Sequence, residues 1–542
     1  MTRPPLVLRR RRPARTSWFA SLRRVVRLAL LANHRPSVPT DELFEMYATS
    51  RRTFLKASVG VSAWAAAGVL GGGWLTACHR ARPGDPRVVI VGAGVAGLNA
   101  AYMLKKSGVR ADVYEGSNRS GGRILSARGL LAPGLVTELG GEFIDSSHAD
   151  ILALAQEFGL TLLDRQAESE TKLRTAYFFG GRHHSERQVV EAFRPLVARI
   201  DKDAATLGEV IDFRNPGNAA ALDKLSLGEY LDKIGARGWI REFLKVAYVT
   251  EFGLDEGEQS ALNLITLIST DLSAGKLEVF GDSDERYKIS GGNSAITEHL
   301  TRRLDGQIHL GQRLEAIRSR GTGYTLSFQT PNQAVHDVHA DFVILTLPFS
   351  VLRDVRLTVD LPSYKRKAIQ ELGYGTNAKI LLGASQRIWR HQKYSGEVFS
   401  DQPFQLAWDN SQGQPGLAGG LTLFSGGKAG VDVGLDTSEH QANRLMPGME
   451  RVFPGIRATL NAKVARHHWP SAPFSKGSYA CYRPGQWTTI AGAEFEPVGN
   501  LHFAGEHCST DFQGFMNGGA ESGRRAAQAL LAALGKARAA VA

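Results

Sequence analysis

The chain has 542 residues, of which 43% are hydrophobic and 22% charged, so its composition is that of a globular protein long enough for two domains. Its formal charge of +12 lies almost wholly in residues 1–56, where thirteen Lys or Arg residues outnumber three Asp or Glu residues. The remainder nets only +2, which argues against a nucleic-acid partner. Three cysteines without CxxC or HExxH spacing predict no disulfide framework and no metal site, and Cys481 and Cys508 are expected to be separate thiols.

The first 78 residues resemble an export leader. Residues 50–56, Ser-Arg-Arg-Thr-Phe-Leu-Lys, resemble the bacterial twin-arginine signal, and an uncharged segment follows them. Residues 75–78, Leu-Thr-Ala-Cys, resemble a lipoprotein processing box, which leaves open a lipid anchor at Cys78 or a retained membrane span. We expect export by the Tat translocase to the periplasm or the outer face of the cell membrane. Residues 1–49 are predicted to be a disordered or mis-assigned N-terminal extension, with Met46 as the alternative start.

A strand, a glycine loop and a helix follow in the order that dinucleotide-binding folds use. Residues 87–91, Arg-Val-Val-Ile-Val, form a β-branched run typical of a buried parallel strand, and residues 92–97 read Gly-Ala-Gly-Val-Ala-Gly. The three glycines allow, in order, a tight turn, the approach of a phosphate to the backbone, and close packing of the next helix. The amides that begin this helix would then face a pyrophosphate. The cofactor-contacting residues predicted here are Gly92, Gly94, Val95, Ala96 and Gly97.

The residues after the second predicted strand, 111–114, distinguish FAD from NAD. The strand ends at Glu115, which is placed to accept hydrogen bonds from a ribose, as in both cofactor classes. Residues 117–123, Ser-Asn-Arg-Ser-Gly-Gly-Arg, give the chain a specific resemblance to the flavin amine oxidase family, which includes monoamine oxidases and L-amino-acid oxidases. The resemblance implies that Arg119, Gly122 and Arg123 wrap an FAD pyrophosphate and approach the flavin ring.

The resemblance covers residues 88–530 and implies an α/β fold with two interleaved domains. One is a Rossmann-like FAD-binding domain of the glutathione-reductase or amine-oxidase type, and the other is an α+β substrate domain. The FAD-binding domain is expected at 86–145, 286–350 and 495–535, and the substrate domain at 146–285, mostly helical, and 351–494. Further cofactor contacts implied by the family's motifs are Gly140, Gly141, Glu142, Leu314, Trp469, Gly505, Glu506 and Met516.

Oxidation of an amine by a flavin needs positioning and a dry pocket more than it needs reactive side chains. The resemblance implies that Lys379 holds a water against flavin N5, and that Tyr479 and Phe515 form an aromatic cage for a neutral amine nitrogen. Ser478 occupies the position of the cysteine that binds flavin covalently in monoamine oxidases. Because a serine cannot form that thioether, FAD is expected to be non-covalent.

The implied reaction is the oxidation of a primary or secondary amine or an L-amino acid. Hydride passes to the flavin, O2 is reduced to H2O2, and the imine hydrolyses to an aldehyde or keto acid and ammonia. The alternatives are an amino-acid monooxygenase of the tryptophan type, a flavin desaturase or porphyrinogen oxidase, and a flavin-bearing scaffold.

The substrate class stays open at the level of sequence. Amino-acid oxidases of this family often place an arginine after the glycine pair, where this chain has Glu142. Glu142 could attract a cationic amine or be a satisfied structural acid, and Arg174 or Arg483 could still bring an arginine to the pocket.

Overall fold

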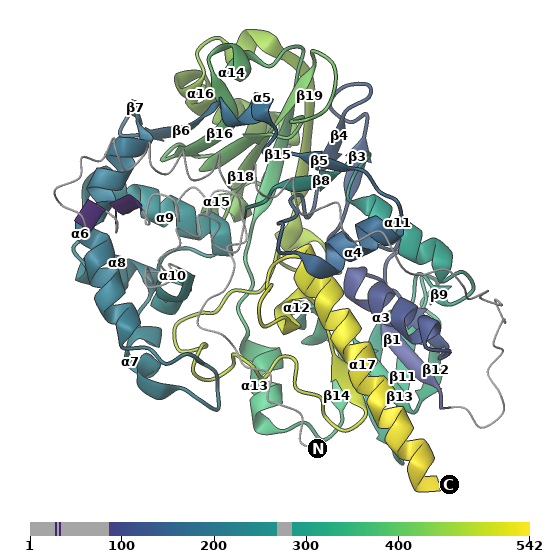
Figure 1. The fold of residues 1–542 in the computed structure, drawn as a ribbon. Helices are drawn as coiled ribbons and strands as arrows, with labels where there is room; N and C mark the ends of the chain where they lie inside the picture. Colours follow the sequence, from purple (N-terminus) through teal and green to yellow (C-terminus); the bar gives the residue numbers. More distant parts are fainter. Residues whose placement is uncertain (1–27, 30–31, 34–85, 268–283, 542) are drawn as a thin grey trace, which may run out of the picture.

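The computed structural model describes residues 28–29, 32–33, 86–267 and 284–541, and Figure 1 shows their arrangement. One sheet lies beside α3 and α17 at the lower right of Figure 1, a second lies at the top, and helices α6 to α10 lie at the left. The twin-arginine motif, the uncharged segment and Cys78 are outside the described residues. Among the described helices, none is long and apolar enough to cross a membrane.

The strand predicted over residues 87–91 is the centre of a five-stranded parallel sheet with the order β20-β13-β1-β2-β9. β1 and β13 are buried along their whole length, in agreement with their continuous apolar sequences. The strands come from all three ranges expected to build the FAD-binding domain. They are β1 (Val88–Val91), β2 (Ala111–Tyr114), β9 (Ile308–His309), β13 (Phe342–Leu345) and β20 (Leu501–Phe503).

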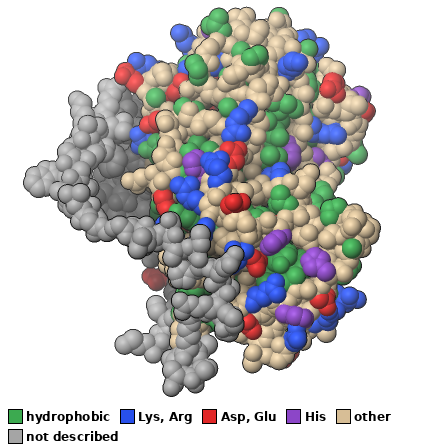
Figure 2. Space-filling model, turned by 90° about the vertical axis from the view of Figure 1, so that its right-hand side faces the viewer, with side chains coloured by type: hydrophobic (Ala, Val, Ile, Leu, Met, Phe, Trp, Pro, Cys, Tyr) green, Lys and Arg blue, Asp and Glu red, His purple; other side chains and the backbone are tan. Residues whose placement is uncertain are grey.

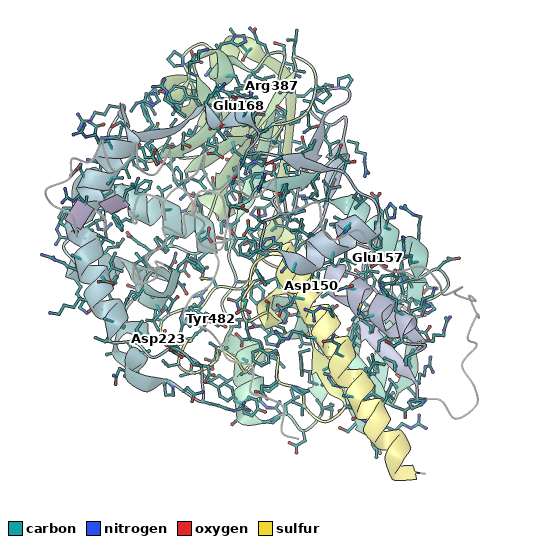
Figure 3. All side chains as sticks on the ribbon, viewed as in Figure 1. Asp150, Glu157, Glu168, Asp223, Arg387 and Tyr482 are labelled. Carbon is teal, nitrogen blue, oxygen red and sulfur yellow. The ribbon has the colours of Figure 1, made fainter. Side chains whose placement is uncertain are left out.

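A layer of helices packs beside this sheet. α3 (Val95–Lys106) follows β1, and both α11 (Ser294–Arg303) and α17 (Met516–Val541) pack against it. α4 (Ala149–Glu157) carries two acids, labelled in Figure 3, that bind the neighbouring helices. Asp150 pairs with Arg524 of α17 at 2.5 Å, and Glu157 pairs with Lys106 of α3 at 3.0 Å. The glycine loop therefore lies between a buried strand and a helix layer that ion pairs hold together.

The second sheet has seven strands in the order β19-β15-β18-β17-β16-β6-β7. β15 and β18 are buried at every position. All seven strands fall in the two ranges expected to build the substrate domain. They are β6 (Arg174–Phe179), β7 (Arg182–His184), β15 (Ala378–Ala384), β16 (Tyr394–Ser400), β17 (Leu406–Asp409), β18 (Gly419–Ser425) and β19 (Leu460–His468).

Two details differ from the sequence-based prediction. Residues 146–285 contain strands as well as the predicted helices. β6 runs parallel to β16, with Tyr177 opposite Phe399, and so joins β7 to five strands that lie far along the chain. The domain boundary at residue 350 is also too early, because β14 (Arg356–Thr358) pairs with β10 of a separate sheet. That four-stranded sheet contains β10 (Arg313–Arg320), β11 (Gly323–Gln329), β12 (Val335–Ala340) and β14.

The other elements connect these sheets or cover them. Two small sheets pair β3 (Ser126–Arg128) with β4 (Val136–Glu138), and β5 (Leu162–Asp164) with β8 (Tyr287–Ile289). The longer remaining helices are α6 (Glu186–Ala205), α8 (Leu227–Lys233), α9 (Gly238–Phe252), α10 (Ala261–Leu267), α13 (Ser363–Glu371) and α16 (Ser438–Val452). The short ones are α5 (Glu168–Thr171), α7 (Ala220–Asp223), α12 (Phe349–Leu352), α14 (Ile388–His391) and α15 (Gly427–Asp432).

Four residues of the N-terminal extension are described, and they pack on α6. Arg194 donates to Asn33 Oδ1 and to Ala32 O, each at 2.9 Å, and Leu28 and Ala29 are fully buried in the apolar cluster that contains Phe193. The prediction of disorder therefore does not hold for these four residues, because Leu28, Ala29 and Ala32 are buried in that cluster and Asn33 is hydrogen-bonded to Arg194. On the face drawn in Figure 2, basic and acidic side chains are interspersed over the described residues.

Candidate functional site

A cavity of about 490 Å³ is lined by residues of the five-stranded and the seven-stranded sheets and of the loops between them. Every site residue predicted from the sequence lines this cavity except Gly97. Those that line it are Gly92, Gly94, Val95, Ala96, Glu115, Arg119, Gly122, Arg123, Gly140, Gly141, Glu142, Leu314, Lys379, Trp469, Tyr479, Gly505, Glu506, Phe515 and Met516.

The glycine loop forms one end of the cavity. Gly92 has φ +104°, and a Cβ on Gly97 would lie 1.9 Å from Gly92 O, so both positions require glycine for the close contact of loop and helix. Within α3 the amide of Leu98 is bonded to Gly94 O at 2.9 Å, and helix geometry leaves the preceding amides without intrahelical partners. A Cβ on Gly94 would meet no atom within 4 Å. This open space in front of a helix N-terminus fits a phosphate group.

Glu115 is held beside that loop. Its Oε2 accepts from Ala93 N and its Oε1 accepts from Ser117 N, each at 2.8 Å. The carboxylate is therefore fixed at the mouth of the glycine loop. A carboxylate oxygen can accept more than one hydrogen bond, so this placement is compatible with the predicted contact to ribose hydroxyls.

The two predicted arginines differ in their surroundings. Arg123 Nη1 donates to Ser478 O and to Glu506 Oε1, each at 2.8 Å, so its charge is balanced inside the protein. Arg119 Nη2 donates instead to the carbonyl oxygen of Gly122 at 2.6 Å, and burial lowers the pKa of its guanidinium. Of the two, Arg119 is the better placed to offer positive charge to an anion, whereas Arg123 joins segments of the cavity wall.

The glycine pair at 140–141 has a packing role that the sequence did not show. A Cβ on Gly140 would lie 1.9 Å from Arg123 O, and a Cβ on Gly141 would lie 2.6 Å from Met516 Cγ. The pair therefore lets three distant segments of the cavity wall meet. Only glycine allows this approach at position 140, because the atom it would strike belongs to the backbone.

Two buried lysines share one carboxylate at the side of the cavity. Lys379 Nζ donates to the carbonyl oxygens of Glu138 and Gly140, each at 2.9 Å. It also donates to Glu142 Oε2 at 3.0 Å, and Lys288 Nζ donates to Glu142 Oε1 at 2.9 Å. Burial alone would raise the pKa of Glu142, but the two ammonium groups outweigh it and lower that pKa to about 2. Two roles were considered for Glu142. The geometry agrees with a structural acid whose oxygens are hydrogen-bonded inside the protein, and it does not agree with an acid that attracts a cationic amine.

Sequence reasoning missed Lys288. The available signal was an ionisable residue between Tyr287 and Ile289 in a short strand, because a buried charge in such a place needs a partner. Lys288 Nζ also donates to Asn410 O at 3.1 Å.

Aromatic rings line the cavity together with Lys379, whose Nζ lies 5.3 Å from the centroid of the Trp408 ring. Tyr479 donates its hydroxyl to Thr250 O at 3.1 Å, and Phe515 packs edge-on against the ring of His148 at a centroid distance of 4.7 Å. His148 is itself fully buried beside Asp145, with Nε2 and Oδ2 3.2 Å apart. Four further Phe or Trp rings that line the cavity were not predicted from the sequence. They are Phe143, Trp408, Phe424 and Phe474.

The arginines proposed as carboxylate clamps do not reach the cavity. Arg174 stacks on Tyr394 at 4.7 Å, and Arg483 pairs with Glu258 at 3.2 Å on the surface. Neither is among the residues that line the cavity. Among the described residues, no group of three or more His, Cys, Asp or Glu side chains could hold a metal ion.

Ser478 lines the cavity and donates its hydroxyl to Asn377 Oδ1 at 2.6 Å. Cys481 and Cys508 are buried and are not joined by a disulfide, as expected, and neither lines the cavity.

Comparison with known proteins gives one consistent family. The sequence model described as flavin containing amine oxidoreductase matches residues 95–531. A flavin-containing amine oxidase of Danio rerio is 24% identical over 463 residues, covering 83% of this chain and 86% of its own. A flavin-containing amine oxidase B of Sus scrofa is 24% identical over 465 residues, with the same shares covered.

Solved structures share the fold. Cyclohexylamine oxidase of Brevibacterium oxydans has a TM-score of 0.72 at 22% identity, covering 83% of this chain and 99% of its own. A putrescine oxidase bound to putrescine has a TM-score of 0.70 at 21% identity, covering 82% and 99%. These likenesses establish an FAD-binding amine oxidase fold.

Proposed function

Because the chain belongs to the flavin-containing amine oxidoreductases, whose members depend on FAD, we propose that it oxidises a monoamine with an apolar or aromatic body. The cofactor is FAD held without a covalent bond, and O2 is the electron acceptor, reduced to H2O2. The imine product hydrolyses to an aldehyde or ketone. Ammonia is released with it, or a primary amine when the substrate is a secondary amine.

The observation that carries this proposal is the aromatic wall around Lys379. Tyr479 and Phe515 are joined there by Phe143, Trp408 and Phe424. Phe143 meets Trp408 edge-on at 5.9 Å, and Trp408 meets Phe424 edge-on at 5.3 Å, so these three rings form one continuous surface. Such a surface gains free energy by covering an apolar substrate, at about 25 cal/mol per Å² of buried apolar area.

The charged groups near these rings favour a monoamine over an amino acid. Both oxygens of Glu142 are taken by lysines. The described arginines that line the cavity are Arg119 and Arg123, which follow the glycine loop, and Arg313, which pairs with Glu315 beside Leu314, a predicted cofactor contact. A substrate carboxylate lying against the aromatic wall would therefore lack the arginine partner that an amino-acid oxidase or monooxygenase of this family often uses.

When FAD is bound, it supplies the acceptor for a hydride from the carbon next to the amine nitrogen. The protein's own part is to orient the amine and exclude water. The rings of Tyr479 and Phe515 would orient the nitrogen, and the N-terminus of α17, which begins at Met516, would present its positive end to developing negative charge. Lys379 has all three of its N–H donors engaged by protein acceptors, so its proposed contribution is a fixed positive charge rather than a held water.

A substrate screen tests the proposal. The purified protein is mixed without oxygen with benzylamine, 2-phenylethylamine or cyclohexylamine, and in parallel with putrescine, L-lysine or L-phenylalanine. We expect the monoamines to bleach the flavin absorbance fastest and, once oxygen is admitted, to yield one H2O2 per aldehyde or ketone. Faster bleaching by an L-amino acid would contradict the proposed substrate class, and amide formation would indicate the monooxygenase.

We also propose that the enzyme is exported by the twin-arginine route and stays at the outer face of the membrane through a lipid on Cys78. The supporting observations are the sequence motifs at 50–56 and 75–78 alone. Mass spectrometry of the mature N-terminus tests this. A Cys78 terminus carrying acyl chains is expected, and an unprocessed terminus would refute the proposal.

A further inference from the structure

The shared carboxylate of Glu142 belongs to a buried charge cluster drawn from three distant segments. Glu142 follows β4, Lys288 lies on β8, and Lys379 lies on β15. Their side chains are only 3%, 4% and 5% exposed. Buried charges are stable only when they are paired and hydrogen-bonded, and this arrangement satisfies that requirement with two cations on one anion. The three groups together carry a charge of +1.

The groups around the cluster cancel only part of this charge at neutral pH. Burial raises the pKa of Glu138 to about 7, even though Lys288 opposes it, so this carboxyl is partly protonated there. His467, which lies opposite Lys379 in the neighbouring strand, has its pKa lowered to about 4 by burial and by Lys379. It is therefore neutral. Asn410 contributes only its carbonyl oxygen, to Lys288.

Lys379 presents its charge at the cavity wall, and Lys288 does not line the cavity. Without Lys288, the carboxylate of Glu142 would neutralise Lys379 alone. With Lys288 on the other oxygen, Glu142 is shared, and a net positive charge remains beside the cavity. Two-electron reduction adds negative charge to a flavin, and a fixed cation in a water-poor site stabilises that charge more than it would in water.

We propose that Lys288 and Glu142 are positioning residues that set the net charge presented through Lys379, and that they thereby tune the reduction potential of the bound FAD. The inference rests on the FAD dependence of the family and not on the choice of amine. Reduction potentials are measured without substrate, so their outcome is separate from that of the substrate screen.

The test is a set of three variants of the FAD-loaded protein. Lys288→Met lowers the charge of the cluster to zero, Glu142→Gln raises it to +2, and the double variant returns it to +1. We expect the potential to fall in Lys288→Met, to rise in Glu142→Gln, and to return near the wild-type value in the double variant. Each single change should alter the equilibrium constant of two-electron reduction at least about tenfold, which is about 30 mV.

A matched control removes a lysine outside the cluster. Lys463 is exposed on β19, the strand that also carries His467, and Lys463→Met should leave the potential unchanged. A merely structural role for Lys288 and Glu142 would move both single variants in the same direction or leave both at the wild-type potential, and either result would overturn the proposal.

Glu142→Gln leaves two buried lysines without their carboxylate, so this variant is the one at risk of failing to fold. If Glu142→Gln does not retain FAD, the reduction potentials of Lys288→Met and of the double variant test the proposal. Equal potentials in those two proteins would overturn the proposal, because only the second restores the charge of +1.

Discussion

Gly94 and Gly97 lie three residues apart in the glycine loop, and the structure gives them different roles that one pair of substitutions separates. A Cβ at position 97 would lie 1.9 Å from Gly92 O, a backbone atom that moves only if β1 and α3 separate. A Cβ at position 94 would meet no protein atom within 4 Å, and this residue lines the cavity. We therefore expect Gly97→Ala to damage the fold and Gly94→Ala to damage cofactor binding.

The expected magnitudes follow from these contacts. Gly97→Ala forces an extra methyl group into a closed space, which should reduce the free energy of unfolding of the FAD-free protein by about 1–3 kcal/mol. Gly94 has φ −72° and ψ 176°, a conformation that alanine adopts readily, so Gly94→Ala should change that free energy by less than about 0.5 kcal/mol. Its methyl group would hold a phosphate away from the helix amides. FAD affinity should then fall at least about tenfold, or about 1.4 kcal/mol.

Urea unfolding of the stripped proteins measures the first quantity, and titration with FAD, followed by quenching of flavin fluorescence, measures the second. Wild-type FAD affinity in Gly94→Ala would refute the assignment of this space to a phosphate. Wild-type stability of stripped Gly97→Ala would refute the packing argument.

Three further predictions concern single side chains in and beside the cavity. The pKa of Glu138 is raised from 4.5 to about 7, so the folded protein keeps this proton longer than the unfolded chain, and stability should fall by about 3 kcal/mol as pH rises through that window. Urea unfolding at pH 4.5 and pH 7 should show the fall in the wild type and not in Glu138→Gln. Acid precipitation should release all the flavin, because Ser478 cannot form a thioether, and yellow colour left in the pellet would contradict this. Tyr479→Phe removes the hydroxyl that donates to Thr250 O and keeps the ring, so flavin reduction by amine should slow less than about tenfold. Tyr479→Ala, which removes the ring, should slow it more, and equal rates in stopped-flow measurements would remove the ring from substrate positioning.

The parts of the fold that the sequence predicted are those specified by neighbouring residues. β1, the glycine loop and α3 follow one another directly, and each is specified by its own apolar or glycine pattern. β6 was not predicted, because it is stabilised by parallel pairing with β16, more than 200 residues later. Non-local pairing of this kind leaves no mark in the sequence of either strand beyond an apolar run that a helix could also show.

In the candidate site, too, the sequence predicted the residues that belong to a motif and missed those placed by non-local strand pairing. Family motifs predicted Lys379, Tyr479 and Phe515 as parts of one site, and all three line the same cavity, although nothing local in the sequence connects them. The same motifs did not indicate Trp408 or Phe424, because an aromatic residue in a buried strand is usually part of the core. Only the pairing of β17 with β18 places these two rings against the cavity.

Lys379 lies in the cavity that the family motif predicted, and its hydrogen bonds bear on the role proposed for it. An ammonium group has three donors, and two carbonyl oxygens and Glu142 accept from all three. Holding a water at the same nitrogen would require breaking one of these bonds, and leaving a buried acceptor unpaired costs about 1–3 kcal/mol. The contribution of Lys379 is therefore its charge, and the size of that charge at the cavity depends on whether Glu142 is shared with Lys288. Lys288, which shares Glu142 with Lys379, does not line the cavity and lies on β8, a strand that no cofactor motif identifies.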